Sequence, residues 1–486
     1  MTSLADLGTL LTRLRAALHF DPERAPGTVS GVPATLTWQC HEDGRIRIEV
    51  ASALPDAAAF DGLHGSHVGP SGVVESLDLG DLDELRMSSA LFSGTWLSPR
   101  APILFERAVE AGDTVVLQAR MGPESWRQTF RIVCAARSLQ PKRLETLSGD
   151  GAVFEVDGFA QGIFCAVPRF LRWRRGWLAD TVEISSIQAS AQTLTYVLPD
   201  ARGNRVAHVD ASVPSKVRTT RSPRGRLPLA RGTIDGRDVG WLLLDSGAGS
   251  SAIDVIVADR LGLTGLGRSW IVTPTGGMGT GYRRASVLRV GPLTIPDPLL
   301  VELDLGPIST VLGVRVAGIL GFDLFAQSMV RLVHEPLTIE LFGSEHAPAA
   351  IWHDVRFQDR VPMLKGVLGG NSSRSKAGLI ALDTASSAPV LLREQIAADL
   401  ALAQRPARRA VSGVSGAGSL GVASLPWIEV GGEQFKRVRA LISDASEGAL
   451  ASTTTLGSLG WGFFRGRELL LDWPRQRISM KPARAD

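Results

Sequence analysis

The chain lacks the features that mark several classes of protein. It has only three cysteines among 486 residues, Cys40, Cys134 and Cys165, and they do not have the spacing of a metal site. Their apolar neighbours predict buried thiols rather than disulfides. No apolar run reaches the length of a transmembrane helix. The net charge is only +3, so we expect no nucleic-acid partner.

A signal peptide is also missing from the N-terminus. Residues 3–20 place leucines and charged residues at helical spacing, which predicts an amphipathic helix instead of an uninterrupted apolar segment. We therefore expect a cytoplasmic protein. A true start upstream of Met1 that carries a signal would instead make it an exported protein, periplasmic or extracellular.

What the chain does contain is a repeated pattern. An apolar run ends in an aspartate followed by hydroxyl and small residues at WLLLDSGAGSS (residues 241–251) and again at LIALDTASSAP (379–389). Before these aspartates stand RLPLARGTIDG and RVPMLKGVLGG, and each reads as a strand that enters a hairpin. After them come two helical patterns, AIDVIVADRLGL and VLLREQIAADLAL. Two carboxylates delivered in this way predict a pair that meets.

The repeat extends to a third block in each unit. GILGFDLF begins at Gly318 and GSLGWGFF at Gly457, and the two blocks follow Asp245 and Asp383 at nearly equal spacing. Each unit closes with a strand-like segment, MVRLVHEPLTIELF and ELLLDWPRQRISM. A duplication of about 120 to 140 residues is too long for a solenoid repeat and has the size of one lobe.

These blocks resemble the bacterial aspartyl proteases of the retropepsin-like and pepsin-like type, over residues 222–483. The matching sequence motifs are Asp245-Ser246-Gly247-Ala248 with Ile319-Leu320-Gly321, and Asp383-Thr384-Ala385-Ser386 with Ser458-Leu459-Gly460. The resemblance implies a mainly β fold in which two fused, barrel-like lobes each contribute one aspartate.

The resemblance also implies a catalytic chemistry. Two carboxylates held about 3 Å apart cannot both ionise, so they share one proton. One can then activate a water while the other protonates the scissile carbonyl oxygen, with no metal or other cofactor. Asp245 and Asp383 would be this catalytic dyad. By analogy with the family, the hydroxyls of Ser246 and Thr384 brace the two turns; the remaining supporting residues are Gly247, Ala385 and Ser386.

Glycine-rich stretches lie between the aspartate and the third block of each unit, at residues 273–284 and 411–424. Glycines let a hairpin approach a ligand, as an active-site flap must. The predicted flap and substrate-binding residues are Gly276, Gly277, Met278, Gly279, Gly416, Ala417 and Gly418. Gly416, Gly418 and Gly421 also spell G-x-G-x-x-G, but the strand-like SLPWIEVGG that follows excludes a dinucleotide site, which needs a helix there.

Three positions depart from the family pattern. Ala385 replaces a glycine, and if its backbone needs a positive φ the methyl group adds strain beside Asp383. Gly462 stands opposite Asp323, so the units differ there. Neither glycine-rich stretch has a tyrosine at its tip; Met278 is the nearest bulky residue and Tyr282 lies beyond the glycines.

The first part of the chain has a different pattern. Residues 27–200 form short alternating runs broken by turn residues, which predicts a curved antiparallel sheet. With the N-terminal helix against it, the pattern is similar to the half-barrel domains of lipoprotein carriers. Such a sheet either positions substrate as an accessory domain or binds an apolar ligand. His64 and His67 have no further ligand nearby, so we expect a loop and no metal. The basic and aromatic run at residues 169–177 is expected to be a solvated face.

Together these patterns predict three domains and a peptide-cleaving site. The N-terminal domain covers residues 1–215, the first lobe residues 216–346 and the second lobe residues 347–486, with a linker over 198–226 and a shorter joint at 343–350. Because one chain supplies both aspartates, a monomer is sufficient for an aspartic-type endopeptidase site. The alternatives are a protein that binds extended peptides without cleaving them, because of Ala385, and a carrier of apolar ligands.

Overall fold

The computed structural model describes residues 25–29, 32–40, 45–69, 71–93, 103–121, 128–138, 140–146, 153–161, 166–175, 178–183, 206–274, 276–371, 373–403, 405–413 and 416–483. The chain divides into two compact units. The first unit holds residues 1–70, 74–200 and 267–270, and the second holds 71–73, 201–266 and 271–486. The described residues are mainly β, as expected. The predicted N-terminal helix and Cys165 lie outside them.

The first unit is built on one 13-stranded antiparallel sheet. Its strand order is β6-β5-β4-β3-β2-β1-β13-β12-β11-β10-β9-β8-β7. The strands are β1 (Ala25–Val29), β2 (Val32–Cys40), β3 (Ile46–Ser52), β4 (Asp56–Phe60), β5 (Gly65–Val68), β6 (Val74–Leu77), β7 (Leu104–Ala111), β8 (Thr114–Met121), β9 (Gln128–Ala135), β10 (Pro141–Thr146), β11 (Val153–Gln161), β12 (Ala166–Arg175) and β13 (Leu178–Glu183). Two meanders therefore meet where β1 pairs with β13.

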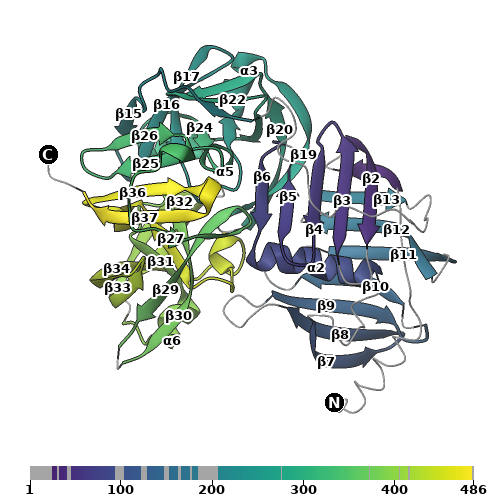
Figure 1. Cartoon of the computed structure of the whole chain (residues 1–486). Coiled ribbons are helices and arrows are strands. Elements are labelled where there is room, and N and C mark those ends of the chain that lie inside the picture. The colour runs from purple at the N-terminus through teal and green to yellow at the C-terminus, as the bar shows by residue number, and fades with distance from the viewer. Residues whose placement is uncertain are drawn as a thin grey trace. The chain divides into compact units, whose positions relative to one another are not determined.

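Helix α2 (Leu79–Ser93) connects the two edge strands β6 and β7. It crosses one face of the sheet and contacts β2, β4 and β9 (Figure 1). Its Met87 is completely buried in a cluster with Leu117, Phe130, Ile132 and Cys134. The helix thus covers apolar side chains that the sheet would otherwise expose on this face. Among the described helices, none is long and apolar enough to cross a membrane.

The first lobe contains an 11-stranded sheet. Its order is β14-β22-β21-β16-β17-β24-β18-β23-β20-β19, and β15 pairs with β16. The strands are β14 (His208–Val209), β15 (Thr219–Arg221), β16 (Pro228–Ile234), β17 (Arg237–Leu244), β18 (Ala252–Asp254), β19 (Thr264–Thr273), β20 (Gly276–Arg284), β21 (Val287–Val290), β22 (Leu293–Pro296), β23 (Leu299–Leu303) and β24 (Val316–Leu320). Its helices are α3 (Val255–Leu261), α4 (Gly306–Leu312) and α5 (Phe322–Phe325).

The second lobe repeats this plan in an eight-stranded sheet of order β28-β29-β30-β35-β31-β34-β33-β32. The strands are β28 (Arg356–Gln358), β29 (Val361–Gly369), β30 (Ser375–Asp383), β31 (Val390–Arg393), β32 (Arg405–Gly413), β33 (Gly416–Val430), β34 (Glu433–Ser443) and β35 (Gly457–Gly460). Its helical segments are α6 (Glu394–Asp399), η5 (Ala449–Ala451) and η6 (Trp461–Phe464). The helical patterns expected after the aspartates begin as short strands, β18 and β31, before each helix.

A third sheet of the second unit joins the lobes. Its order is β26-β25-β36-β37-β27, with β25 (Met329–Val333) and β26 (Thr338–Phe342) from the first lobe and β27 (His353–Asp354), β36 (Arg467–Asp472) and β37 (Arg477–Pro482) from the second. Short 3-10 turns, η4 (Ser344–His346) and η7 (Trp473–Arg475), flank it. The closing segment of each repeat, expected as one strand, is therefore a hairpin. Antiparallel pairing of β25 with β36 holds the lobes together.

The prediction of a linker over residues 198–226 is wrong for its described part, residues 206–226. Within residues 206–226, β14 pairs with β22 and β15 pairs with β16, so this stretch adds strands to the first lobe's sheet. Its backbone amides find ladder partners there, which a composition rich in arginine and proline did not indicate. The three-domain division itself stays a prediction.

The buried His334 lies at the junction of the lobes, directly after β25. Its ring stacks on Trp461 of the second lobe, with ring centroids 4.7 Å apart and planes 25° apart. Burial, aided by the charge of Arg221, lowers the pKa of His334 to about 4. The neutral ring is therefore the form that packs between the lobes.

We predict that His334 makes the protein sensitive to acid. Its folded pKa lies below the unfolded value of about 6.5, so its stabilising effect is complete above that pH and is lost as the pH falls toward 4 and below. His334→Phe keeps the stacked ring. Between pH 7 and 4.5 its free energy of unfolding should fall by about 2 kcal/mol less than that of the unmodified protein, measured by urea unfolding. The exposed His346→Gln is the control; equal losses in all three proteins would refute the assignment.

Candidate functional site

The first aspartate stands at the end of a buried strand. Leu244 closes β17 and pairs in parallel with Leu320 of β24. The Asp245 N–H then donates to the Leu320 carbonyl at 3.0 Å, which anchors the start of the turn. The turn closes on the aspartate itself, because Gly247 N–H donates to Asp245 Oδ1 at 2.8 Å and Ala248 N–H to its carbonyl at 3.3 Å.

The second turn has the same construction. Leu382 of β30 pairs in parallel with Leu459 of β35. Ala385 N–H donates to Asp383 Oδ1 at 2.9 Å, and Ser386 N–H donates to the Asp383 carbonyl at 3.3 Å. The corresponding distances in the first turn are 2.8 Å and 3.3 Å. Two segments far apart in the chain therefore hold their carboxyl groups in the same way.

Four hydrogen bonds tie one turn to the other. Ser246 N–H donates to Thr384 Oγ1 at 2.9 Å, and Thr384 N–H donates to Ser246 Oγ at 3.1 Å. The Ser246 hydroxyl donates in turn to the Leu382 carbonyl at 3.0 Å, and the Thr384 hydroxyl to the Leu244 carbonyl at 2.8 Å. Both hydroxyl residues are buried, so each hydroxyl accepts one bond and donates another without water.

This network brings the two carboxyl groups together. A Cβ atom placed on Gly247 would lie 3.1 Å from Asp383 Cγ and 3.3 Å from Asp245 Oδ1. Both groups thus lie within 3.3 Å of one point. A separation of about 8 Å, which would rule out a shared proton or one bridging water, does not fit this geometry.

The surroundings of the carboxyl groups favour their neutral forms. Burial is the main cause that raises the pKa of Asp245, and the neighbouring charge of Asp383 raises it further. Burial also raises the pKa of Asp383, against the lowering effect of the Ala385 and Ser386 amides. Because the groups interact, these shifts belong to the pair. The pair therefore keeps at least one proton to a higher pH than isolated aspartates would.

A comparison with family models supports the assignment of the first turn. Residues 230–324 match the aspartyl protease family model. The match runs from β16 to α5 and contains the turn with Asp245. Among solved structures the chain is similar to an aspartic proteinase from Irpex lacteus, which is 13% identical and covers 55% of this chain and 97% of its own, with a TM-score of 0.35. It is also similar to a LolA superfamily protein from Nitrosomonas europaea, which is 11% identical and covers 38% of this chain and 94% of its own, with a TM-score of 0.27. A comparison with curated proteins finds no match.

The strain expected at Ala385 is absent. Residues with positive φ among those described include neither Ala385 nor its counterpart Gly247. Alanine adopts the backbone of this turn without the penalty of the left-handed region. The condition for strain at Ala385, a positive φ, is therefore not met.

The difference between Asp323 and Gly462 also has a structural reason. The buried Asp323 accepts a hydrogen bond from Ser251 N–H at 2.6 Å. The residue at the position of Ser251 in the second lobe is Pro389, which has no N–H to satisfy. A Cβ on Gly462 would lie 3.3 Å from Pro389 N and 2.7 Å from the Ser387 carbonyl. Each lobe thus carries a matched pair, and the asymmetry does not touch the aspartates.

We expect Asp323→Ala to destabilise the first lobe by about 1–3 kcal/mol, because the buried Ser251 amide loses its acceptor. Asp323→Asn is the matched control, since its side-chain oxygen can still accept the bond. Urea unfolding of the three proteins measures the effect. If the Asn variant loses as much stability as the Ala variant, the bond to Ser251 is not the reason for the aspartate.

Two glycine-rich hairpins project from the lobes. The predicted residues Gly276, Gly277, Met278 and Gly279 all lie at the start of β20, after the turn from β19. Gly416, Ala417 and Gly418 lie at the start of β33, where they pair with Gly413, Ser412 and Val411 of β32. In each hairpin the predicted glycines therefore lie in the returning strand. The structure assigns no role to them by itself.

Each hairpin reaches the opposite lobe. Leu450 N–H of the second lobe donates to the Pro274 carbonyl of the first hairpin at 2.9 Å. Helix α4 of the first lobe lies beside β32 of the second hairpin. Because α4 and η5 occupy equivalent places, directly before β24 and β35, the contacts are related by the same repeat. The sequence analysis did not identify the segment at residues 447–450, where one glycine is the only indication of a close contact.

That glycine, Gly448, allows a close approach. Its φ is 76°, and a Cβ there would lie 2.3 Å from Gly276 N and 2.5 Å from the Thr273 carbonyl. We predict that Gly448→Ala separates the first hairpin from the second lobe. Amide hydrogen exchange at Leu450 should become at least about tenfold faster. Gly466→Ala, also at positive φ but with open space around its Cβ, controls for backbone strain. Unchanged exchange at Leu450 would contradict the contact.

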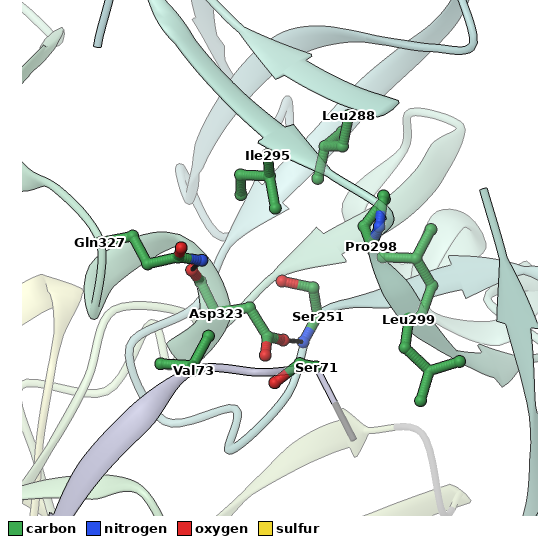
Figure 2. A pocket seen from close by; sticks show the side chains of 10 residues that line it. Ser71, Val73, Ser251, Leu288, Ile295, Pro298, Leu299, Asp323 and Gln327 are labelled. Carbon is green, nitrogen blue, oxygen red and sulfur yellow. Dashed lines mark hydrogen bonds between the residues drawn. The ribbon is translucent and has the colours of Figure 1, made fainter. Parts of the chain in front are cut away.

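A small cavity lies beside Asp323 and Ser251 (Figure 2). Its polar side holds Asp323, Ser251 and Gln327, and its apolar side holds Leu288 and Ile295. The free space is about 10 Å³, which is about the size of one water molecule. It is too small for a substrate and belongs to the packing around Asp323.

The remaining predictions concern the first unit. His67 lies between Glu75 and Asp56, with its Nε2 3.0 Å from Asp56 Oδ1, and His64 is exposed. The two carboxylates raise the pKa of His67 to about 10, although burial opposes them, so the ring is a cation in an ion-pair cluster. No group of metal-binding side chains occurs among the described residues. Part of the run at 169–177 forms β12, whose side chains lie outside the description.

Proposed function

We propose that this protein is an aspartic-type endopeptidase in which Asp245 and Asp383 form the catalytic dyad. The single observation that carries the proposal is the reciprocal set of hydrogen bonds between Ser246 and Thr384, which holds two carboxyl groups against one another. The aspartyl protease match over residues 230–324 supports the same chemistry for the first lobe.

In this mechanism the dyad holds one proton between two carboxyl groups. The ionised carboxylate removes a proton from a water as its oxygen attacks the scissile carbonyl carbon. The neutral carboxyl donates its proton to the carbonyl oxygen, so water is added across the C=O bond. Collapse of this diol then breaks the C–N bond, the departing nitrogen takes up a proton, and the dyad returns to its single-proton state.

The raised pKa values favour this state. A pair that keeps one proton to a higher pH remains competent at higher pH than two isolated aspartates would. A peptide is the substrate class, because the dyad chemistry adds water to an amide carbonyl. One chain supplies both aspartates, so we propose that a monomer is sufficient. The first unit is proposed to be an accessory domain.

The test is peptide hydrolysis by the full chain. We expect cleavage of an unfolded protein substrate with an optimum above about pH 4, where isolated aspartates titrate, because both pKa values of the pair are raised. Mass spectrometry of the products follows the reaction. Asp245→Asn and Asp383→Asn should each lower kcat/KM by at least about 100-fold, because each removes one half of the proton relay. Asp354→Asn, an exposed aspartate on β27, is the control and should keep full activity.

Two results would overturn the proposal. Hydrolysis that persists in Asp245→Asn would show that the dyad does not perform the reaction. Peptide binding without cleavage at any pH by the unmodified protein would favour the alternative of a peptide-binding protein. Lipid that copurifies with the full chain, together with the absence of hydrolysis, would favour the carrier alternative.

A further inference from the structure

An aromatic residue directly after Gly321 holds the first aspartate turn through its main chain. This residue is Phe322, whose N–H donates to the Ala248 carbonyl at 2.9 Å. The Ala248 N–H donates in turn to the Asp245 carbonyl at 3.3 Å. A Cβ on Gly321 would lie 2.8 Å from the Ala248 carbonyl, so the two main chains are in close contact. The position of Phe322 therefore determines where the last residue of the turn lies.

The second lobe repeats this arrangement with a larger ring. Trp461 follows Gly460, and its N–H donates to the Ser386 carbonyl at 2.7 Å. The Ser386 N–H donates to the Asp383 carbonyl at 3.3 Å, and a Cβ on Gly460 would lie 2.6 Å from the Ser386 carbonyl. Phe322 and Trp461 are thus equivalent residues, and each is bonded to the aspartate turn of its own lobe.

The buried ring of Phe322 is held by the second lobe. Phe357 of β28 contacts it edge-on, with ring centroids 5.4 Å apart and planes at 81°. The Arg360 guanidinium, from the turn between β28 and β29, lies over the same ring at 5.8 Å from its centroid. Both arrangements suit an aromatic ring, whose face is negative and whose edge is positive. The first aspartate turn is therefore connected to the second lobe through Phe322.

The ring of Trp461 is held by His334, which belongs to the first repeat. The two buried rings stack with their centroids 4.7 Å apart. The His334 N–H donates to the Arg467 carbonyl at 2.9 Å, which fixes the histidine at the end of the pairing between β25 and β36. Among the described residues Trp461 Nε1 has no hydrogen-bond partner, so packing fixes this ring. The second aspartate turn is therefore connected to the first repeat through Trp461.

We propose that Phe322 and Trp461 are positioning residues through which each lobe fixes the aspartate turn of the other lobe. Displacement of either ring moves the main-chain N–H that holds the Ala248 or the Ser386 carbonyl. The last residue of the turn then moves relative to its aspartate, and a misplaced catalytic group slows the chemical step. For this effect on catalysis, the inference rests on the proposed function.

Amide hydrogen exchange tests the connection without a substrate. Phe357→Leu removes the ring that contacts Phe322 but keeps an apolar side chain in the core. The amides of Phe322 and Ala248, both in the first lobe, should then exchange at least about tenfold faster, because local opening of their bonds needs less free energy. Exchange at the second turn should not change. If Phe357→Leu does not fold, Arg360→Ala, at a half-buried position, makes the same prediction.

His334→Leu should give the opposite pattern. The amides of Trp461 and Ser386 should exchange at least about tenfold faster, while exchange at the first turn stays the same. His334→Phe keeps an aromatic ring and should restore slow exchange. Phe435→Leu is the matched control, because its ring pairs with Phe463 at the same distance, 4.7 Å, but within one lobe. Both turns of this control should keep slow exchange.

Peptide hydrolysis distinguishes positioning from a general loss of stability. Phe357→Leu and His334→Leu should each lower kcat by roughly 10- to 100-fold with little change in KM, because the dyad is misplaced while the groups that bind peptide remain. His334→Phe should recover most of kcat, and Phe435→Leu should keep it.

The result that supports the inference is a crossed pattern, in which each substitution affects the turn of the opposite lobe and lowers kcat. Equal acceleration of exchange at both turns, or no acceleration, would contradict the connection. A crossed pattern with unchanged kcat would show that the rings do not position the dyad, and would also overturn the inference. If the crossed pattern occurs in a protein that cleaves no peptide, the connection between ring and turn is supported and the proposed function is refuted.

Discussion

The structure of the site depends on one set of hydrogen bonds, those through which Ser246 and Thr384 link the two aspartate turns. Neither carboxyl group would stay beside the other without it, because each aspartate belongs to a separate sheet. The bonds are buried and reciprocal, so loss of one hydroxyl leaves two main-chain groups of the opposite lobe without these partners. The sheet in which β25 pairs with β36 and the stacking of His334 on Trp461 support the same junction from behind.

The two lobes differ at the equivalent positions Asp323 and Gly462, and the surroundings of each residue explain the difference. Asp323 accepts a hydrogen bond from the buried Ser251 amide, whereas Pro389 at the corresponding place has no N–H that needs an acceptor. The Ser387 carbonyl lies close to where a side chain on Gly462 would begin. In the sequence alone, this difference suggests that the second repeat has degenerated. In the structure, the loss of the aspartate is matched by the loss of the amide hydrogen that it would accept. Strands β30 and β35 still pair in parallel up to Asp383.

Ala385 is a second departure from the family pattern that the structure accommodates, and it lies beside Asp383. A methyl group in place of a glycine hydrogen counts as damage only if the backbone requires a positive φ, and here it does not. A change that weakens the family resemblance in sequence therefore leaves the backbone of the turn without strain.

The sequence by itself determined the mainly β fold, the duplication and the two aspartates, because apolar alternation, turn residues and the matched spacing of the repeated blocks are local or periodic signals. It could not place the strands at 206–226 in the first lobe's sheet, separate each closing segment into a hairpin, or find the contact of Gly448 with the opposite hairpin. It could not decide whether the backbone at Ala385 is strained or why Gly462 stands where the first lobe has Asp323. Those outcomes depend on which main-chain groups meet across the lobes and on the φ angle at a turn, and both are set by packing between residues far apart in the chain.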